Sequence, residues 1–178
     1  MRFSARQFQT WSAPVLQLPA EAEQRAALEL FRLDQAFSAE PRLLRRLADR
    51  SLTIDERMAW LERVLSLESD QPLAQVLRML MQENGFTVWS TFFHEYLRVR
   101  ERIGLGRVFL VRSQTALTPT EETAIRTDLE SRFSQPATIA FKQSDDVKGG
   151  VEIESPDGWV LDATIAGRLS RLAIALAS

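Results

Sequence analysis

Apolar residues between positions 8 and 103 recur every three or four residues, the spacing that gathers side chains on one face of an α-helix. Six stretches show this pattern. They are Phe8, Trp11 and Val15; Ala26, Leu30, Leu33 and Phe37; Leu43, Leu44 and Leu47; Ile54, Met58, Leu61 and Leu65; Leu73, Val76, Leu77, Leu80 and Met81; and Trp89, Phe92, Phe93, Tyr96 and Ile103. Amphipathic helices joined by short connections cannot each bury a stripe alone, so the pattern predicts a six-helix bundle.

Local signals mark the ends of the fourth and fifth predicted helices. Thr53 and Glu56 have the spacing of a capping box, in which the hydroxyl and the carboxylate each accept a hydrogen bond from an unpaired backbone N–H. Asp70 is a predicted cap for the next helix, and Pro72 stands in its first turn, where a missing N–H costs nothing. Asn84-Gly85 predicts the end of that helix.

The pattern changes near Gly104, after which glycines and strand-forming residues become frequent. The predicted strands are 107–113, 137–143, 151–154 and 159–161, and the predicted helices are 119–133, capped by Thr118, and 164–176. The first strand–helix–strand order predicts a right-handed crossover, and the turn residues at 155–158 predict a hairpin. The expected fold class is α+β, with an N-terminal six-helix bundle in residues 1–105 and a small C-terminal α/β domain in residues 106–178.

Composition excludes most catalytic and metal chemistry. The chain has no cysteine and a single histidine, His94, so thiolate sites are excluded and an imidazole-based site has one candidate. We interpret His94 as a surface or core-edge residue. We expect no catalytic residue, no metal site and no cofactor.

Charge argues against a dedicated nucleic-acid binder. The 22 basic and 24 acidic residues give a net charge of −2, and in residues 1–105 the 14 basic and 14 acidic side chains cancel. The aromatic cluster at 86–96 is interpreted as bundle core, with a base-stacking platform for nucleic acid as the alternative. Such platforms are usually flanked by a basic groove, but here Glu95 and Glu101 offset the charges of Arg98, Arg100 and Arg102. A further basic face, made of Arg42, Arg45, Arg46 and Arg50, is interpreted as a solvated helix surface, with a phosphate site as the alternative.

No apolar run reaches the roughly 18 residues of a membrane-spanning helix. The N-terminal residues also lack the unbroken apolar core of a secretion signal. We therefore expect a protein that stays on the cytoplasmic side and is not inserted into the membrane.

Residues 145–172 read DDVKGGVEIESPDGWVLDATIAGRLSRL. This segment resembles the C-terminal signature of the delta subunit of bacterial F-type ATP synthases, which corresponds to the mitochondrial oligomycin sensitivity conferral protein. The matching positions are Gly149, Gly150, Asp162, Thr164 and Leu169. We also interpret the glycine pair as a turn with positive φ, since phosphate-binding glycine motifs are absent, and Asp162 as the cap of the last helix.

The resemblance implies a non-catalytic stator subunit. In the family, the helical domain binds N-terminal helices of the alpha subunits, with the beta subunit as a further candidate partner, and the C-terminal domain binds the end of the b-subunit stalk. The implied role is to hold the catalytic head still so that ion-driven rotation is coupled to ATP synthesis. The implied location is the cytoplasmic side of the bacterial inner membrane, as a peripheral protein that binds no nucleic acid.

The family also suggests where the alpha subunit binds, because its helix lies there between the first and fifth helices of the bundle. By position, the candidate groove residues in this chain are Phe8, Trp11, Val15, Leu73, Leu77 and Leu80. Apolar side chains at these spacings suit an amphipathic partner helix.

Three other functions remain as alternatives. A helical nucleic-acid-binding factor would resemble residues 1–105 but would carry a basic surface. A stator-like regulator of a secretion ATPase would share the binding logic, although such proteins have a long helical region that this chain lacks. A small enzyme with an aspartate-based site in residues 106–178 would need motifs that are missing.

Overall fold

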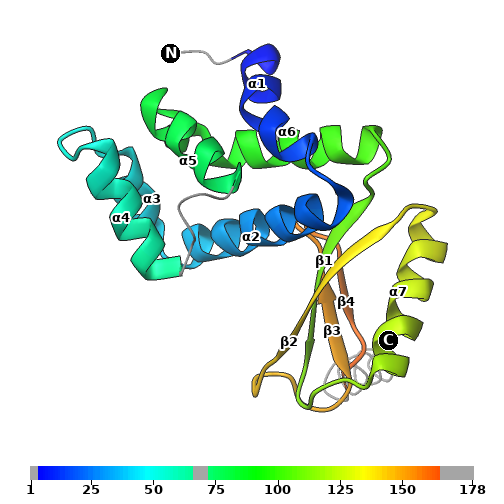
Figure 1. Ribbon diagram of the computed structural model, residues 1–178. Helices are drawn as coiled ribbons and strands as arrows, with labels where there is room; N and C mark the ends of the chain where they lie inside the picture. The colour runs from blue at the N-terminus through cyan, green and yellow to red at the C-terminus, as the bar shows by residue number, and fades with distance from the viewer. Residues whose placement is uncertain (1–3, 66–71, 165–178) are drawn as a thin grey trace, which may run out of the picture. The chain divides into compact units, whose positions relative to one another are not determined.

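The computed structural model describes residues 4–65 and 72–164, which form seven α-helices, one short 3₁₀ helix and four strands (Figure 1). The fold class is therefore α+β. The chain divides into two compact units, Met1–Arg102 and Ile103–Ser178, where the sequence analysis placed the change between residues 105 and 106. The predicted cap at Asp70 and nearly all of the predicted last helix, residues 164–176, lie outside the described residues.

The first unit is helical. Its elements are α1 (Ala5–Leu16), α2 (Ala20–Ala39), α3 (Pro41–Ala48), α4 (Ile54–Leu65), α5 (Pro72–Gln82), the 3₁₀ helix η1 (Gly85–Val88) and α6 (Trp89–Arg102). Each α-helix coincides with a predicted amphipathic stretch, whereas η1 was not predicted. Helix α1 packs against α5 and α6, α2 packs against α3 and α6, and α4 packs against α5.

Both local signals around α4 and α5 that lie in described residues are confirmed. The Glu56 N–H donates to Thr53 Oγ1 at 3.2 Å, and the Thr53 N–H donates to Glu56 Oε2 at 2.8 Å. These bonds from Thr53 hold the pKa of the Glu56 carboxyl below its usual value. After α5, Asn84 adopts a φ of 59°, the left-handed conformation that turns the chain out of the helix.

The second unit is a mixed four-stranded sheet with one described helix. Its elements are β1 (Arg107–Ser113), α7 (Pro119–Phe133), β2 (Ala137–Gln143), β3 (Val151–Glu154) and β4 (Val160–Asp162). The strand order is β2-β1-β3-β4, with β1 parallel to β2 and antiparallel to β3. The capping box at Thr118 and Glu121, which opens α7, is confirmed.

The hairpin of β3 and β4 forms as predicted, but β4 begins one residue later than the predicted start at Trp159. The reason is the turn, which is closed by a bond of 2.9 Å from the Ser155 N–H to the Trp159 carbonyl. Pairing therefore starts with Glu154 opposite Val160.

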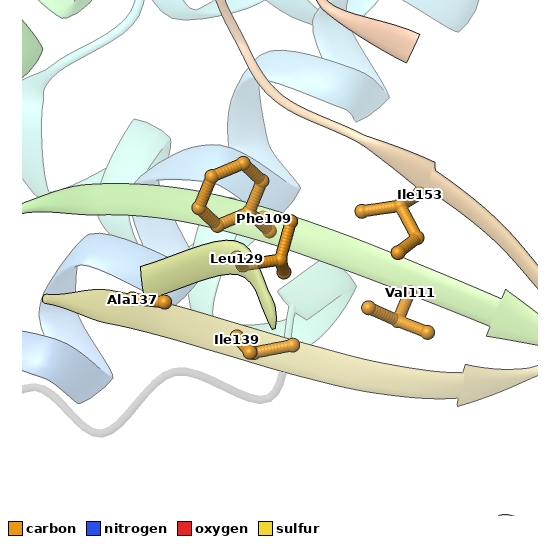
Figure 2. Close-up of a cluster of buried hydrophobic side chains, with 6 residues drawn as sticks. All are labelled: Phe109, Val111, Leu129, Ala137, Ile139 and Ile153. Carbon is orange, nitrogen blue, oxygen red and sulfur yellow. The ribbon is translucent and has the colours of Figure 1, made fainter. Parts of the chain in front are cut away.

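The core of the second unit lies between the sheet and α7 (Figure 2). Alternate residues of β1, Phe109 and Val111, point to this side, as the two-residue period of a strand requires. They meet Ile139 of β2, Ile153 of β3 and Leu129 of α7, and Leu129 is fully buried. Helix α7 therefore covers one face of the sheet.

Candidate partner-binding surfaces

The structure brings the six predicted groove residues together, but inside the helical unit. Their side chains are between 0% and 7% exposed, and they belong to α1 and α5, which pack against each other. The six are Phe8, Trp11, Val15, Leu73, Leu77 and Leu80. In this chain alone they form the interface between α1 and α5, and their contact with a partner helix stays a prediction.

Trp11 shows why these side chains are covered. Its ring contacts Phe8 at a centroid distance of 5.5 Å and Phe92 of α6 at 6.1 Å, both edge to face. A Cβ atom added at Gly85 would lie only 3.2 Å from the far end of the Trp11 ring. Aromatic contacts of this kind add to the gain from burying the ring, and here they join α1 to α6.

A buried polar network joins α2 to α6. Arg100 donates from Nε and Nη2 to the two carboxylate oxygens of Glu23, at 2.8 and 3.0 Å, and the Tyr96 hydroxyl donates to Glu23 Oε1 at 2.8 Å. Both charged side chains are 0% exposed. Burial, and then the nearby Glu23 carboxylate, raise the pKa of Tyr96 well above its usual value.

The sequence analysis missed this network because it grouped Arg100 with Arg98 and Arg102 and set their charges against Glu95 and Glu101. The spacing of residues along the two helices could have revealed the network. Phe93, Tyr96 and Arg100 stand on one helical stripe, and Glu23, Ala26 and Leu30 stand on another. Opposite charges that each interrupt an apolar stripe are candidates for a buried pair.

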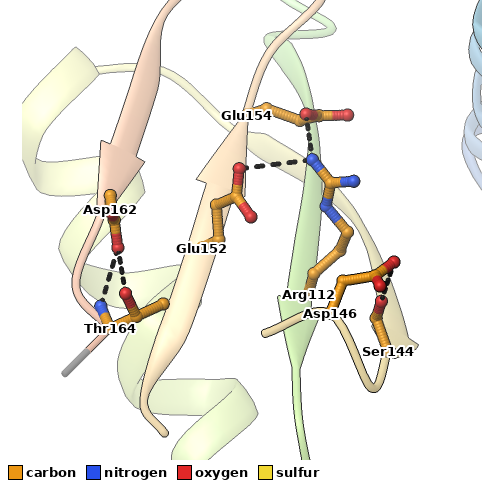
Figure 3. Close-up of polar contacts among 7 residues, drawn as sticks. All are labelled: Arg112, Ser144, Asp146, Glu152, Glu154, Asp162 and Thr164. Atoms are coloured by element: carbon orange, nitrogen blue, oxygen red, sulfur yellow. Dashed lines mark hydrogen bonds and ion pairs between the residues drawn. The ribbon is translucent and has the colours of Figure 1, made fainter. Parts of the chain in front are cut away.

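The sheet face opposite α7 carries a row of charges that changes sign from one edge to the other. In register across the strands lie Lys142, Arg112, Glu152 and Asp162. Arg112 Nη2 donates to Glu154 Oε2 at 2.6 Å and to Glu152 Oε1 at 3.3 Å (Figure 3). These bonds fix the arginine on the sheet and make this end of the face polar. Farther along the same side of β1, Val108 and Leu110 are apolar and buried.

The residues of the C-terminal signature meet in space. Gly149 and Gly150 have φ values of 68° and 85°, which confirms the predicted positive-φ turn. A Cβ atom at Gly150 would lie 2.4 Å from the Ala163 carbonyl oxygen, and the Ala163 N–H donates to the Val151 carbonyl at 2.9 Å. The glycine pair thus lets two distant segments touch.

Asp162 closes the same region. Its Oδ1 accepts hydrogen bonds from the Thr164 N–H at 2.9 Å and from Thr164 Oγ1 at 2.6 Å (Figure 3). This is the contact expected of a carboxylate that caps the following segment. Leu169, the remaining signature residue, lies outside the described residues.

The described residues contain no group of three or more side chains of the types that hold a metal ion. His94 is exposed on α6, where Nδ1 lies 2.7 Å from the Ser90 carbonyl oxygen. None of the helices in residues 4–65 and 72–164 combines the length and hydrophobicity that a membrane crossing requires.

Comparison with known proteins decides the family. Residues 16–176 match the family described as ATP synthase delta (OSCP) subunit, and this range includes most of both structural units. The chain belongs to this family. Members of the delta (OSCP) family are non-catalytic subunits of the ATP synthase peripheral stalk, and this delta-family chain is one of them.

Two relatives come from Syntrophotalea carbinolica. ATP synthase subunit delta 1 and subunit delta 2 of this bacterium are each 31% identical over 147 residues, which covers 82% of this chain and 81% of theirs. ATP synthase subunit delta of Maridesulfovibrio salexigens is 28% identical and covers 82% of this chain and 79% of its own.

A fold similarity comes from a solved structure. One chain of the cryo-EM structure of the Toxoplasma gondii mitochondrial ATP synthase hexamer aligns with a TM-score of 0.50 and 14% identity. The alignment covers 87% of this chain and 97% of that chain. At this identity the similarity concerns the fold.

Proposed function

We propose that this delta-family subunit links the alpha/beta catalytic head to the b-subunit stalk, so that ion-driven rotation is coupled to ATP synthesis. The observation that carries the proposal is the family match over residues 16–176, which spans both units of the chain. A linking subunit needs two separate binding regions, and two compact units supply them. A match of this extent favours neither a nucleic-acid-binding factor nor a secretion-ATPase regulator.

The helical unit is the proposed partner of the head. In this proposal its six α-helices pack as one bundle, and the surface over α1 and α5 receives an amphipathic N-terminal helix of an alpha subunit, with the beta subunit as a further contact. The six predicted groove residues, which are buried between α1 and α5, hold these two helices together. Direct contacts then come from partly exposed apolar side chains on the same helices, namely Ala13 and Leu16 of α1 and Met79 of α5.

The sheet unit is the proposed partner of the b-subunit stalk. The row of charges from Lys142 to Asp162, which changes sign across the strands, offers complementary contacts to a partner with the opposite pattern. The proposed location is the cytoplasmic side of the bacterial inner membrane, as a peripheral member of the complex. The proposed role requires no nucleic acid and no cofactor.

The proposal is tested by affinity capture of the tagged full chain from detergent-solubilised source membranes. Recovery of alpha, beta and b subunits together supports the link, and recovery of none of them contradicts it. A second measurement compares membranes with and without the chain. Removal is expected to abolish ATP synthesis driven by an ion gradient while ATP hydrolysis by the head continues.

Two variants test the helical surface. Met79→Asp is expected to lower recovery of the alpha subunit, because it places a charge among the proposed apolar contacts. Val64→Asp on α4 is the matched control, since Val64 is an exposed apolar residue, 50% accessible, on another helix. Equal recovery with both variants would move the alpha-subunit site away from α5.

A further inference from the structure

Helix α3 and the residue pair after it carry an unusual concentration of arginine. Residues 41–50 contain four arginines and one carboxylate, although the whole chain has a net charge of −2. Arg45 and Arg46 stand three and four positions after Arg42, so the three share one side of α3, and Arg50 lies two residues after the end of the helix. All four are exposed. We call these four residues the α3 arginine face.

The two carboxylates nearest in sequence, Glu40 and Asp49, offset only part of the charge of these four arginines. Arg42 Nε lies 4.0 Å from Glu40 Oε1, but that oxygen also accepts the Arg42 N–H at the start of α3. Asp49 Oδ1 accepts the Ser51 N–H at 2.9 Å. Among residues 4–65 and 72–164, no hydrogen bond or ion pair holds Arg45 or Arg50.

Three other arginines of the same unit are held by carboxylates. Arg32 pairs with Glu29 at 2.6 Å, Arg98 with Glu95 at 2.9 Å and Arg78 with Asp55 at 2.9 Å. On α3, by contrast, like charges face one another at spacings of three and four residues, which destabilises an isolated helix. The face therefore has a favourable interaction to gain from carboxylates supplied by another molecule.

An aromatic side chain borders the face on the α4 side. The Arg46 guanidinium lies over the Trp60 ring, 5.3 Å from its centroid, and Trp60 is partly exposed. A stacked guanidinium keeps its edge N–H groups available for carboxylates. The ring beside it offers an apolar contact of the kind that anchors protein interfaces.

We propose that the α3 arginine face, together with Trp60, is a docking surface for an acidic segment of a partner protein, one that presents carboxylates on one side of a helix and an apolar residue next to them. Arginine suits such a partner because its planar fork binds a carboxylate with two parallel hydrogen bonds. This surface is separate from the one proposed over α1 and α5.

Charge and size favour a protein segment over a larger polyanion. A helix of eight residues is only about 12 Å long, which matches two turns of a partner helix. Binding to a membrane or to nucleic acid relies on many phosphate contacts. The rest of this chain carries an excess of acidic residues, which would be repelled by a phosphate-rich surface.

The test uses the full chain and a labelled synthetic peptide with glutamates at positions i, i+4 and i+7 and a neighbouring leucine. A second peptide carries glutamine in place of glutamate. Fluorescence anisotropy at low salt is expected to show binding at least tenfold tighter for the glutamate peptide, with affinity falling as salt rises. Arg45→Glu with Arg46→Glu should abolish that preference, and Arg45→Gln with Arg46→Gln should reduce it.

The matched control is Arg32→Glu with Arg98→Glu, which changes the net charge equally on other helices of the unit. Retained peptide preference in this control supports the proposal, and an equal loss would show that only total charge matters. No preference for the glutamate peptide in the unaltered chain would overturn the proposal. Tighter binding to anionic phospholipid vesicles or to duplex DNA than to the glutamate peptide would overturn it as well.

Discussion

Arg100 and Glu23 are 77 positions apart in the sequence, yet they form a two-point ion pair with both side chains fully buried. The pair joins α6 to α2, and Tyr96 adds a third hydrogen bond to the same carboxylate. These bonds tie α6 to α2 at positions far apart in the sequence.

Removal of one partner from this pair is expected to be costly. Glu23→Ala leaves the Arg100 guanidinium buried without its counter-charge, and we expect a loss of about 3–5 kcal/mol in the free energy of unfolding. Urea unfolding followed by circular dichroism measures the loss. The control is Glu29→Ala, which removes an exposed pair with Arg32 and should cost less than about 1 kcal/mol. Equal losses in the two variants would contradict a special role for the buried pair.

Stability is expected to fall at alkaline pH because of Tyr96. The pKa of Tyr96 in the folded chain is raised above its usual value of 10.0. As the pH rises past the unfolded value, the unfolded chain releases this proton while the folded chain keeps it. Stability is therefore complete below about pH 10 and is lost as the pH rises toward the folded pKa.

This prediction has a direct readout, since Tyr96 is the only tyrosine of the chain. Its phenolate absorbance should appear at higher pH in the folded chain than in denaturant. Tyr96→Phe should cost about 1 kcal/mol at neutral pH through the lost hydrogen bond and should show a flatter alkaline decline. A phenolate signal at the same pH in the folded and the denatured chain would refute the prediction.

Two glycines near the unit boundary should differ in their response to alanine. Gly104 and Gly106 have φ values of 82° and 77°, so each substitution should cost about 1–2 kcal/mol in backbone strain. A Cβ atom at Gly106 would also lie 1.9 Å from the Pro136 carbonyl oxygen, whereas Gly104 has nothing within 4 Å. Gly106→Ala should therefore lose about 3 kcal/mol or more. Thermal unfolding of the two variants makes the comparison, and similar midpoints would disprove the predicted contact.

Asp162→Ala is expected to cost about 1 kcal/mol, the usual value of a capping carboxylate. The variant removes the acceptor of the Thr164 N–H and hydroxyl. Asp145→Ala is the control, because Asp145 is exposed and its loss should stay within about 0.5 kcal/mol. A much larger loss at Asp162 in urea unfolding would show that the carboxylate has a role beyond capping.

Much of the chain could be predicted from local sequence. The capping boxes at Thr53 and Thr118 mark their helix starts because their bonds join residues only three positions apart. The bounds of β1 and β2 follow from strand-forming residues between turns. Membership of the delta (OSCP) family was suggested by the C-terminal signature, whose glycine pair has positive φ and, at Gly150, leaves no room for a side chain.

Only the tertiary structure decided which side chains face inward at positions that look alike in sequence. Periodicity shows that Trp11 and Leu77 lie on apolar stripes, but a buried helix contact and an open groove produce the same stripe. Likewise, Arg98 and Arg100 are close neighbours on α6, yet one is exposed and the other is paired with Glu23. Burial and long-range pairing depend on residues far away in the chain, whereas the bonds that begin a helix involve only its nearest neighbours.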